Sequence, residues 1–292
     1  MNLNLKNFIK RHICIFISLL FVTLIFSFFY FFPNPKLTFR EMTNHLFLED
    51  ITTDTLSLHY TLAYPSNYSI TSYPLTLPRY DKDSLQQSYS KIENSLFSLS
   101  NMDRSALSEE ELYCHNMLKD YFSLQKQGFS YTYLEECFSP SSGIVANYPI
   151  LMAEYTFRTK KDIIDYLTLL ADTPDYFDSF FQFQKERAKK GYFLASKSLQ
   201  ETIEQCDTII TEKSLQENSH FLQLTFRERL TPLLSQNIIS KEDALKYTNQ
   251  NNSILKSIVL PAYQNLKNNL QSLQTKEIPL TGLYKKEKGK LI

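Results

Sequence analysis

The stretch "DIIDYLTLLADTPDYFDSFFQFQKERAKKGYF", residues 162–193, decides the fold because its apolar residues recur at spacings of three and four. Such spacing places them along one face of an α-helix. Thr159, three residues upstream, predicts the cap of a first helix. Thr173 followed by Pro174 predicts the N-cap and first turn of a second helix, and Gly191 predicts its end. We therefore predict two consecutive amphipathic helices, the second with a heavily aromatic stripe that belongs to the core.

The same signals recur upstream. Ser108 and Glu111 form a capping-box pattern, which predicts a helix that ends at Gly128. Its large apolar residues fall on one face of the helix. The members of this face are Tyr113, Met117, Tyr121 and Leu124.

Downstream, Ser198 with Glu201 predicts another helix start. The longest predicted helix begins at Ser240 and extends to about Leu273, with a kink at Pro261, where a backbone donor is missing. Residues 131–150 are expected to be a non-helical interruption. These elements predict a mainly α chain of antiparallel helices, without a parallel sheet.

Residues 13–32, "ICIFISLLFVTLIFSFFYFF", form an uncharged run of 20 residues. At 1.5 Å rise per residue this run can cross a hydrocarbon core of roughly 30 Å, so we predict an N-terminal transmembrane helix. Lys6, Lys10 and Arg11 precede it, which favours a cytoplasmic N-terminus. The predicted organisation is a basic cytoplasmic segment (1–12), a single-pass membrane anchor (13–32) and an extracytoplasmic helical domain (33–292). A cleaved signal peptide is the alternative.

The composition excludes some partners. The 292 residues include 31 basic and 31 acidic side chains, so the chain lacks the basic excess that nucleic-acid binding needs. The exported part contains Cys114, Cys137 and Cys206, whose spacing matches no zinc ribbon or CxxC motif. Three buried thiols are favoured, and one disulfide is the alternative.

A catalytic or metal site is not apparent in the sequence. The five histidines form no HExxH motif. Glu111 and His115 lie one helical turn apart, but no further ligand follows at a suitable spacing, so a surface pair that supports its helix is favoured over a metal site. Glu135 and Glu136 beside Cys137 indicate a turn with a packed cysteine. We therefore predict no catalytic residue, no metal ligand and no cofactor in this chain.

One segment is the candidate substrate site. Residues 142–154, "SGIVANYPILMAE", contain an apolar, strand-like run between a glycine and a proline. A buried connector is one interpretation. The functional interpretation is an extended segment along a cleft that pairs with a bound peptide by strand addition. Its candidate cleft residues are Gly143, Asn147, Tyr148 and Pro149.

Four stretches resemble the N-terminal half of the bacterial DUF885 proteins, in the same order along the chain. They are "LFLEDITTDTLSLHYTLAYPSNYSI" (46–70), "SSGIVANYPILMAEYTF" (141–157), the stretch 162–193 and "VLPAYQNLKNNLQSL" (259–273). The resemblance covers nearly all of residues 37–289. It implies a mostly helical, gluzincin-like zinc metallopeptidase, often exported as a lipoprotein or anchored in the membrane.

The chain also departs from that family. The family's HExxH-like zinc motif and its downstream glutamate ligand belong to a C-terminal half that has no counterpart in these 292 residues. The resemblance therefore implies a membrane-anchored, non-catalytic half that is inactive alone. The alternatives are one half of a split peptidase completed by a second polypeptide, a peptide-binding or scaffold module, and a frameshift relic.

Overall fold

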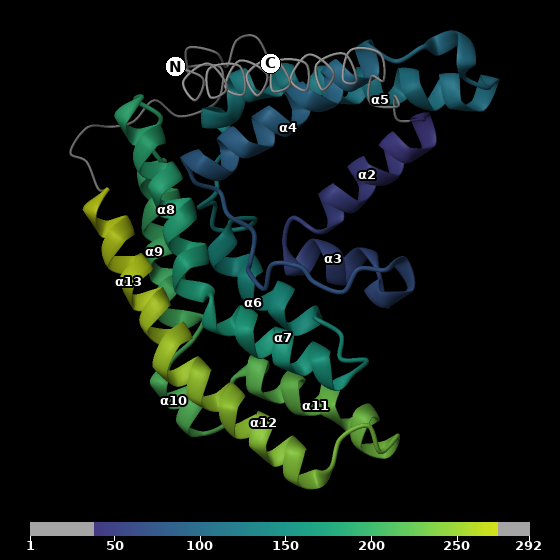
Figure 1. Ribbon diagram of the computed structural model, residues 1–292. Coiled ribbons are helices and arrows are strands. Elements are labelled where there is room, and N and C mark those ends of the chain that lie inside the picture. Colours follow the sequence, from purple (N-terminus) through teal and green to yellow (C-terminus); the bar gives the residue numbers. More distant parts are fainter. Residues whose placement is uncertain (1–37, 274–292) are drawn as a thin grey trace, which may run out of the picture. The chain divides into compact units, whose positions relative to one another are not determined.

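The computed structural model describes residues 38–273, which are helical apart from their connecting loops (Figure 1). The α-helices are α2 (Phe39–Ile51), α3 (Thr55–Thr61), α4 (Lys82–Ser100), α5 (Glu109–Gly128), α6 (Ile144–Glu154), α7 (Lys160–Ala171), α8 (Thr173–Lys189), α9 (Ser196–Thr208), α10 (Glu212–Gln216), α11 (Phe221–Ser235), α12 (Lys241–Ile254) and α13 (Leu260–Ser272). The shorter helical turns are η1 (Pro65–Tyr68), η2 (Arg104–Ala106), η3 (Phe129–Leu134) and η4 (Leu255–Val259). Residues 38–273 contain no β-strand, which confirms the mainly α prediction.

The chain divides into two units, residues 1–45 and residues 46–292. In the first unit the structure describes residues 38–45, where the Glu41 amide donates to the Thr38 hydroxyl at 3.2 Å and so caps α2. The predicted cytoplasmic segment (1–12) and membrane span (13–32) lie outside the described residues. None of the helices in the described range is long and apolar enough to cross a membrane. The features below belong to the second unit.

The core of the second unit lies between helices that are distant in sequence. Helix α13 runs beside α8 and α9, α6 packs against α9 and α11, and α7 packs against α12 (Figure 1). Aromatic rings fill much of this core. Phe177 meets Tyr263 with ring centroids 4.9 Å apart, and Tyr166 meets Phe226 at 5.5 Å. The aromatic stripe of α8 is therefore core, as the sequence predicts.

Three predicted helix starts are confirmed. The side chains of Ser108, Thr159 and Ser240 each accept a hydrogen bond from the backbone amide three residues ahead. In each case the residue that donates this amide also returns a side-chain bond to the cap, which completes a capping box. Each capping box joins two residues three positions apart, so the local sequence pattern is enough to predict these helix starts.

Two other predicted starts are wrong by a few residues. Helix α8 begins at Thr173 rather than after it, because the Thr173 hydroxyl donates back to the Leu170 carbonyl at 2.6 Å. Helix α9 begins at Ser196, which places Ser198 inside the helix. Gly191, with φ of 82°, ends α8 as predicted.

The long C-terminal helix is interrupted ahead of its proline. Helix α12 passes into the π-helical turn η4 and then into α13. The Leu260 amide donates to the Leu255 carbonyl five residues back, the spacing of a π turn. Pro261, which has no amide to donate, follows directly in the first turn of α13.

The non-helical interruption predicted at residues 131–150 is confirmed for residues 135–143 and wrong at both ends. Residues 129–134 form η3, and residues 144–154, expected to be extended, form α6. A short apolar run has no periodicity that separates a buried strand from a buried helix, which explains the error.

Helices α4 and α5 pair with each other, and the pairing buries a different face of α5 from the apolar face noted in the sequence. Its buried side is the His115 side, where Nε2 lies 2.8 Å from the Leu99 carbonyl of α4. The residues that the sequence places on one apolar face occupy the opposite side and are exposed; they are Tyr113, Met117, Tyr121 and Leu124. Helix α5 thus has two apolar faces, and α4 covers the one that the spacing pattern did not single out.

Candidate functional site

Gly143 begins the segment predicted to line a cleft, and its neighbours leave no room for a side chain. A Cβ atom at this position would lie 2.3 Å from the Ser139 carbonyl oxygen and 2.8 Å from that of Cys137. The Gly143 amide donates to the same Ser139 carbonyl at 2.7 Å. Glycine is therefore required where this tight turn enters α6.

The other three candidate residues lie on α6. Tyr148 is completely buried, and its hydroxyl pairs with that of Thr173 at the start of α8. Burial raises the pKa of Tyr148 far above its ordinary value, so the phenol is neutral. Asn147 is exposed, and its amide donates to the Ser142 carbonyl at 2.8 Å.

Pro149 is also buried, and it leaves a carbonyl of α6 without its helical donor. This is the carbonyl of Val145, four residues earlier. The Tyr263 hydroxyl of α13 donates to it at 3.1 Å and replaces the missing bond. Gly143, Tyr148 and Pro149 thus build the packing around α6, whereas Asn147 is exposed near the start of the helix. Contact of these four residues with a substrate stays a prediction.

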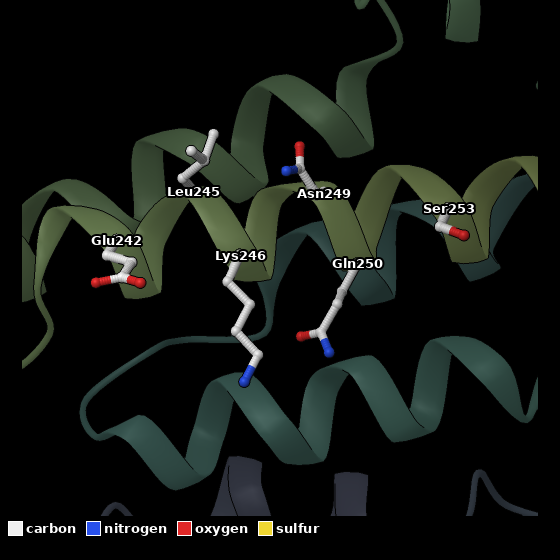
Figure 2. Close-up of a pocket in the computed structure, with 6 residues that line it drawn as sticks. All are labelled: Glu242, Leu245, Lys246, Asn249, Gln250 and Ser253. Carbon is white, nitrogen blue, oxygen red and sulfur yellow. The ribbon is translucent and has the colours of Figure 1, made fainter.

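The second unit has an open groove over α12, hereafter the α12 groove. Its larger part, about 630 Å³, lies between α7 and α12, and a second part of about 500 Å³ continues along α12. Lys246, Gln250 and Ser253 line both parts. Figure 2 shows the Lys246 and Gln250 side chains extending from α12 toward α7.

The groove combines an apolar wall with a few polar groups. Helix α7 contributes Ile164, Leu167 and Ala171 to the wall. Lys246 brings the charge of the larger part, and Glu242, one turn earlier on α12, lines the smaller part. This lining suits the binding of an apolar segment with a polar end, and it offers no paired nucleophile and base.

A buried polar cluster joins α3, α6 and α7 around His59. Nε2 of His59 accepts from the Thr156 amide at 3.1 Å and lies 3.4 Å from an Arg158 guanidinium nitrogen. Because both neighbours are donors, Nε2 carries no proton, and Nδ1 faces Asp162 at 3.9 Å. Burial, above all, lowers the pKa of His59 to about 4, so the ring is neutral at pH 7.

Arg229 of α11 caps the C-terminal end of α6. Its guanidinium donates to the carbonyls of Met152 at 3.0 Å and Tyr155 at 2.6 Å. The same group lies over the rings of Phe157 and Tyr166, at 4.4 and 4.6 Å from their centroids. A cation at the C-terminal end of a helix stabilises both the free carbonyls and the dipole.

The sequence did not single out these two side chains because their partners are distant. His59 and Thr156 are 97 residues apart, and Arg229 and Tyr155 are 74 residues apart. A lone histidine or arginine outside any motif has no local signal for such contacts.

Glu111 and His115, predicted to form a surface pair on α5, each make other contacts. Glu111 caps its own helix through the amide and hydroxyl of Ser108, and His115 is buried against α4 rather than exposed. Within residues 38–273, no group of three His, Cys, Asp or Glu side chains is placed to hold a metal ion. The described residues therefore do not fit a zinc site.

The thiols differ in exposure. All three described cysteines are free; Cys137 and Cys206 are buried, whereas Cys114 is exposed, which corrects the prediction of three buried thiols. Burial raises the pKa of the Cys137 thiol to about 12, so it lacks the thiolate character of a nucleophile.

Comparison with solved structures supports the fold. A crystal structure described as that of the "putative lipoprotein from Colwellia psychrerythraea" superposes with a TM-score of 0.66 at 15% sequence identity. The alignment covers 87% of this chain and 44% of that chain, so this chain spans less than half of that protein's length. No curated relative matches the sequence.

A family comparison gives the relationship directly. The model of DUF885, described as a bacterial protein of unknown function, matches residues 71–287. This range includes α4 through α13, the α12 groove, and Arg229 with the carbonyls that it binds at the end of α6. The chain therefore belongs to the DUF885 family.

Proposed function

We propose that this chain is the non-catalytic, helical half of a DUF885-type zinc metallopeptidase, anchored by residues 13–32 and facing the outside of the membrane. One observation carries the proposal: the fold match covers 87% of this chain and only 44% of the solved chain. In this proposal the zinc ligands and the activated water belong to the part of the architecture that the match leaves out.

The exposed apolar surface is a second support. Soluble monomers rarely expose large contiguous apolar patches, and such patches mark interaction sites. The α12 groove, whose lining includes the exposed Leu245, is a surface on which further protein can pack. In this role the domain acts as a scaffold for the part of the architecture that carries the chemistry, and the split peptidase completed by a second chain is the alternative.

The test compares the full chain alone with the full chain co-expressed with a polypeptide that carries the HExxH-containing half of a DUF885 protein. We expect substoichiometric zinc by elemental analysis and no peptide hydrolysis for the chain alone, and both zinc and hydrolysis for the pair. Tightly bound, near-stoichiometric zinc in the chain alone would overturn the proposal. Inactivity of a stable, zinc-loaded pair would count against a split peptidase.

A second candidate function is a peptide-binding module, which the α12 groove favours. It predicts saturable binding of apolar peptides that weakens at least about tenfold, or roughly 1.4 kcal/mol, when Ala171→Arg fills the groove. Asn147→Ala separates the two candidate sites, because Asn147 is exposed and lies outside the groove lining. Weaker binding in Asn147→Ala alone would locate the peptide at α6 instead.

A further inference from the structure

Helix α5 carries an exposed apolar face that the rest of the described chain does not cover, hereafter the α5 stripe. It consists of Tyr113, Met117, Tyr121 and Leu124, which are 55 to 69% exposed. Their spacings of four, four and three residues keep them on one side of the helix. Four large side chains at this exposure form a patch of several hundred Å², a size that marks interaction sites on soluble domains.

Three carboxylates lie beside the α5 stripe, and one cation, Arg104 of η2, donates to Asn116 on the flank of the stripe at 3.2 Å. Glu110 lies in line with the stripe, about one turn before its first member, Tyr113. Glu109 and Asp120 lie at the edge of the stripe. All three carboxylates are exposed, and none forms an ion pair within residues 38–273. Unpaired carboxylates of one sign favour a cationic partner and disfavour an anionic one.

The lysines of α5 lie elsewhere on the helix. At about 100° per residue, Lys119 and Lys126 fall on the side opposite the stripe. Lys126 is held there by Glu93 of α4 at 2.8 Å and by the ring of Tyr89. The stripe is therefore an apolar, aromatic surface with acidic borders and no basic residue of its own helix beside it.

We propose that the α5 stripe is the docking surface for a basic amphipathic helix of a partner protein. Apolar residues of the partner cover Met117 and Leu124, and its lysines or arginines meet Glu110 and Asp120. The two exposed tyrosine rings add faces to which a cation is attracted. This inference goes beyond the proposed function, because it concerns a different surface and holds whether or not a catalytic half is supplied.

The occupant is a different chain rather than a second copy of this one. If two α5 helices paired antiparallel through their stripes, the acidic first turn of each would meet the C-terminal end of the other, which is the negative end of the helix dipole. An anionic membrane surface is disfavoured for the same reason, since the carboxylates border the stripe.

The test uses the full chain in nanodiscs of zwitterionic lipid, with Cys14→Ser and an environment-sensitive dye on the exposed Cys114. Two synthetic 18-residue amphipathic helices with the same leucine face are titrated, one with lysines and one with glutamates on the polar face. We expect the lysine peptide to bind at least about tenfold more tightly. We expect Met117→Glu to abolish that binding and Asp120→Lys to weaken it several-fold.

Glu228→Lys on α11, at an exposed carboxylate outside both the α5 stripe and the α12 groove, is the matched charge-reversal control and should leave the affinity unchanged. Equal affinity for the two peptides, or a lysine-peptide affinity that survives Met117→Glu, would overturn the proposal. A dye response that depends on protein concentration without peptide would assign the stripe to self-association and overturn it as well. Circular dichroism of each variant verifies that the helices remain folded.

Discussion

Tyr263→Phe tests the way in which the helix packing compensates for Pro149. Proline at this position removes the amide that would bind the Val145 carbonyl, and the Tyr263 hydroxyl donates to that carbonyl at 3.1 Å from α13. The substitution deletes one oxygen atom and keeps the ring, which packs against Phe177. The lost hydrogen bond is therefore the main change.

The burial of both partners sets the magnitude. Val145 is 0% exposed and Tyr263 is 1% exposed, so water cannot replace the lost donor. An unsatisfied buried carbonyl costs about 1–3 kcal/mol, and we expect Tyr263→Phe to lower the free energy of unfolding by that amount. In a Pro149→Ala background residue 149 regains its amide, so the same substitution should cost less than about 0.5 kcal/mol.

The assay is urea unfolding of the full chain, followed by helical circular dichroism, for the four members of this double-mutant cycle. With a slope of about 2 kcal/mol/M, a loss of 2 kcal/mol moves the midpoint by roughly 1 M. Tyr176→Phe is the control, since its hydroxyl makes no hydrogen bond with the described residues and its loss should cost little. An equal loss in the wild-type and Pro149→Ala backgrounds would refute the compensation.

Three further predictions concern other sites. Gly143→Ala should lower the free energy of unfolding by at least about 2 kcal/mol in the same assay, because a Cβ atom would overlap backbone oxygen. Gly128→Ala is the control and should be neutral or stabilising, because Gly128 has open space around it and a helical φ. The pKa of His59 is lowered to about 4, so between pH 6.5 and 4 the unfolded chain binds a proton that the native chain excludes. The free energy of unfolding should then fall on acidification by roughly 2 kcal/mol after allowance for solvent screening, and His59→Gln should flatten this slope; an unchanged slope would contradict the neutral assignment. In peptide-mapped alkylation at pH 8, exposed Cys114 should react much faster than buried Cys137, whose thiol pKa is raised to about 12, and comparable rates would contradict this burial.

The helical class and several helix boundaries were predictable because their determinants are local. The capping boxes at Ser108, Thr159 and Ser240 join residues three positions apart. Gly191 ends α8 through its own backbone conformation. Each of these signals is complete within one helical turn, so the linear pattern contains it.

The candidate site was less predictable because its determinants are distant. Residues 144–154 form a helix whose proline is tolerated because Tyr263 satisfies the free carbonyl of Val145, which is 118 residues from it in the chain. The α12 groove likewise combines α7 with a helix about 80 residues later in the sequence. A local pattern cannot report which surfaces such distant elements leave open.

The sequence by itself determined the helical class, the starts of the three helices with capping boxes, which residues share a face and, through its four family-like stretches, the relationship to DUF885. Tertiary structure alone decided which of the two apolar faces of α5 is buried, and it placed His59, Arg229 and Tyr263 against backbone groups of distant segments. The physical reason is the range of the forces involved. Capping and periodicity act within four residues, whereas burial depends on which other helix arrives to exclude water.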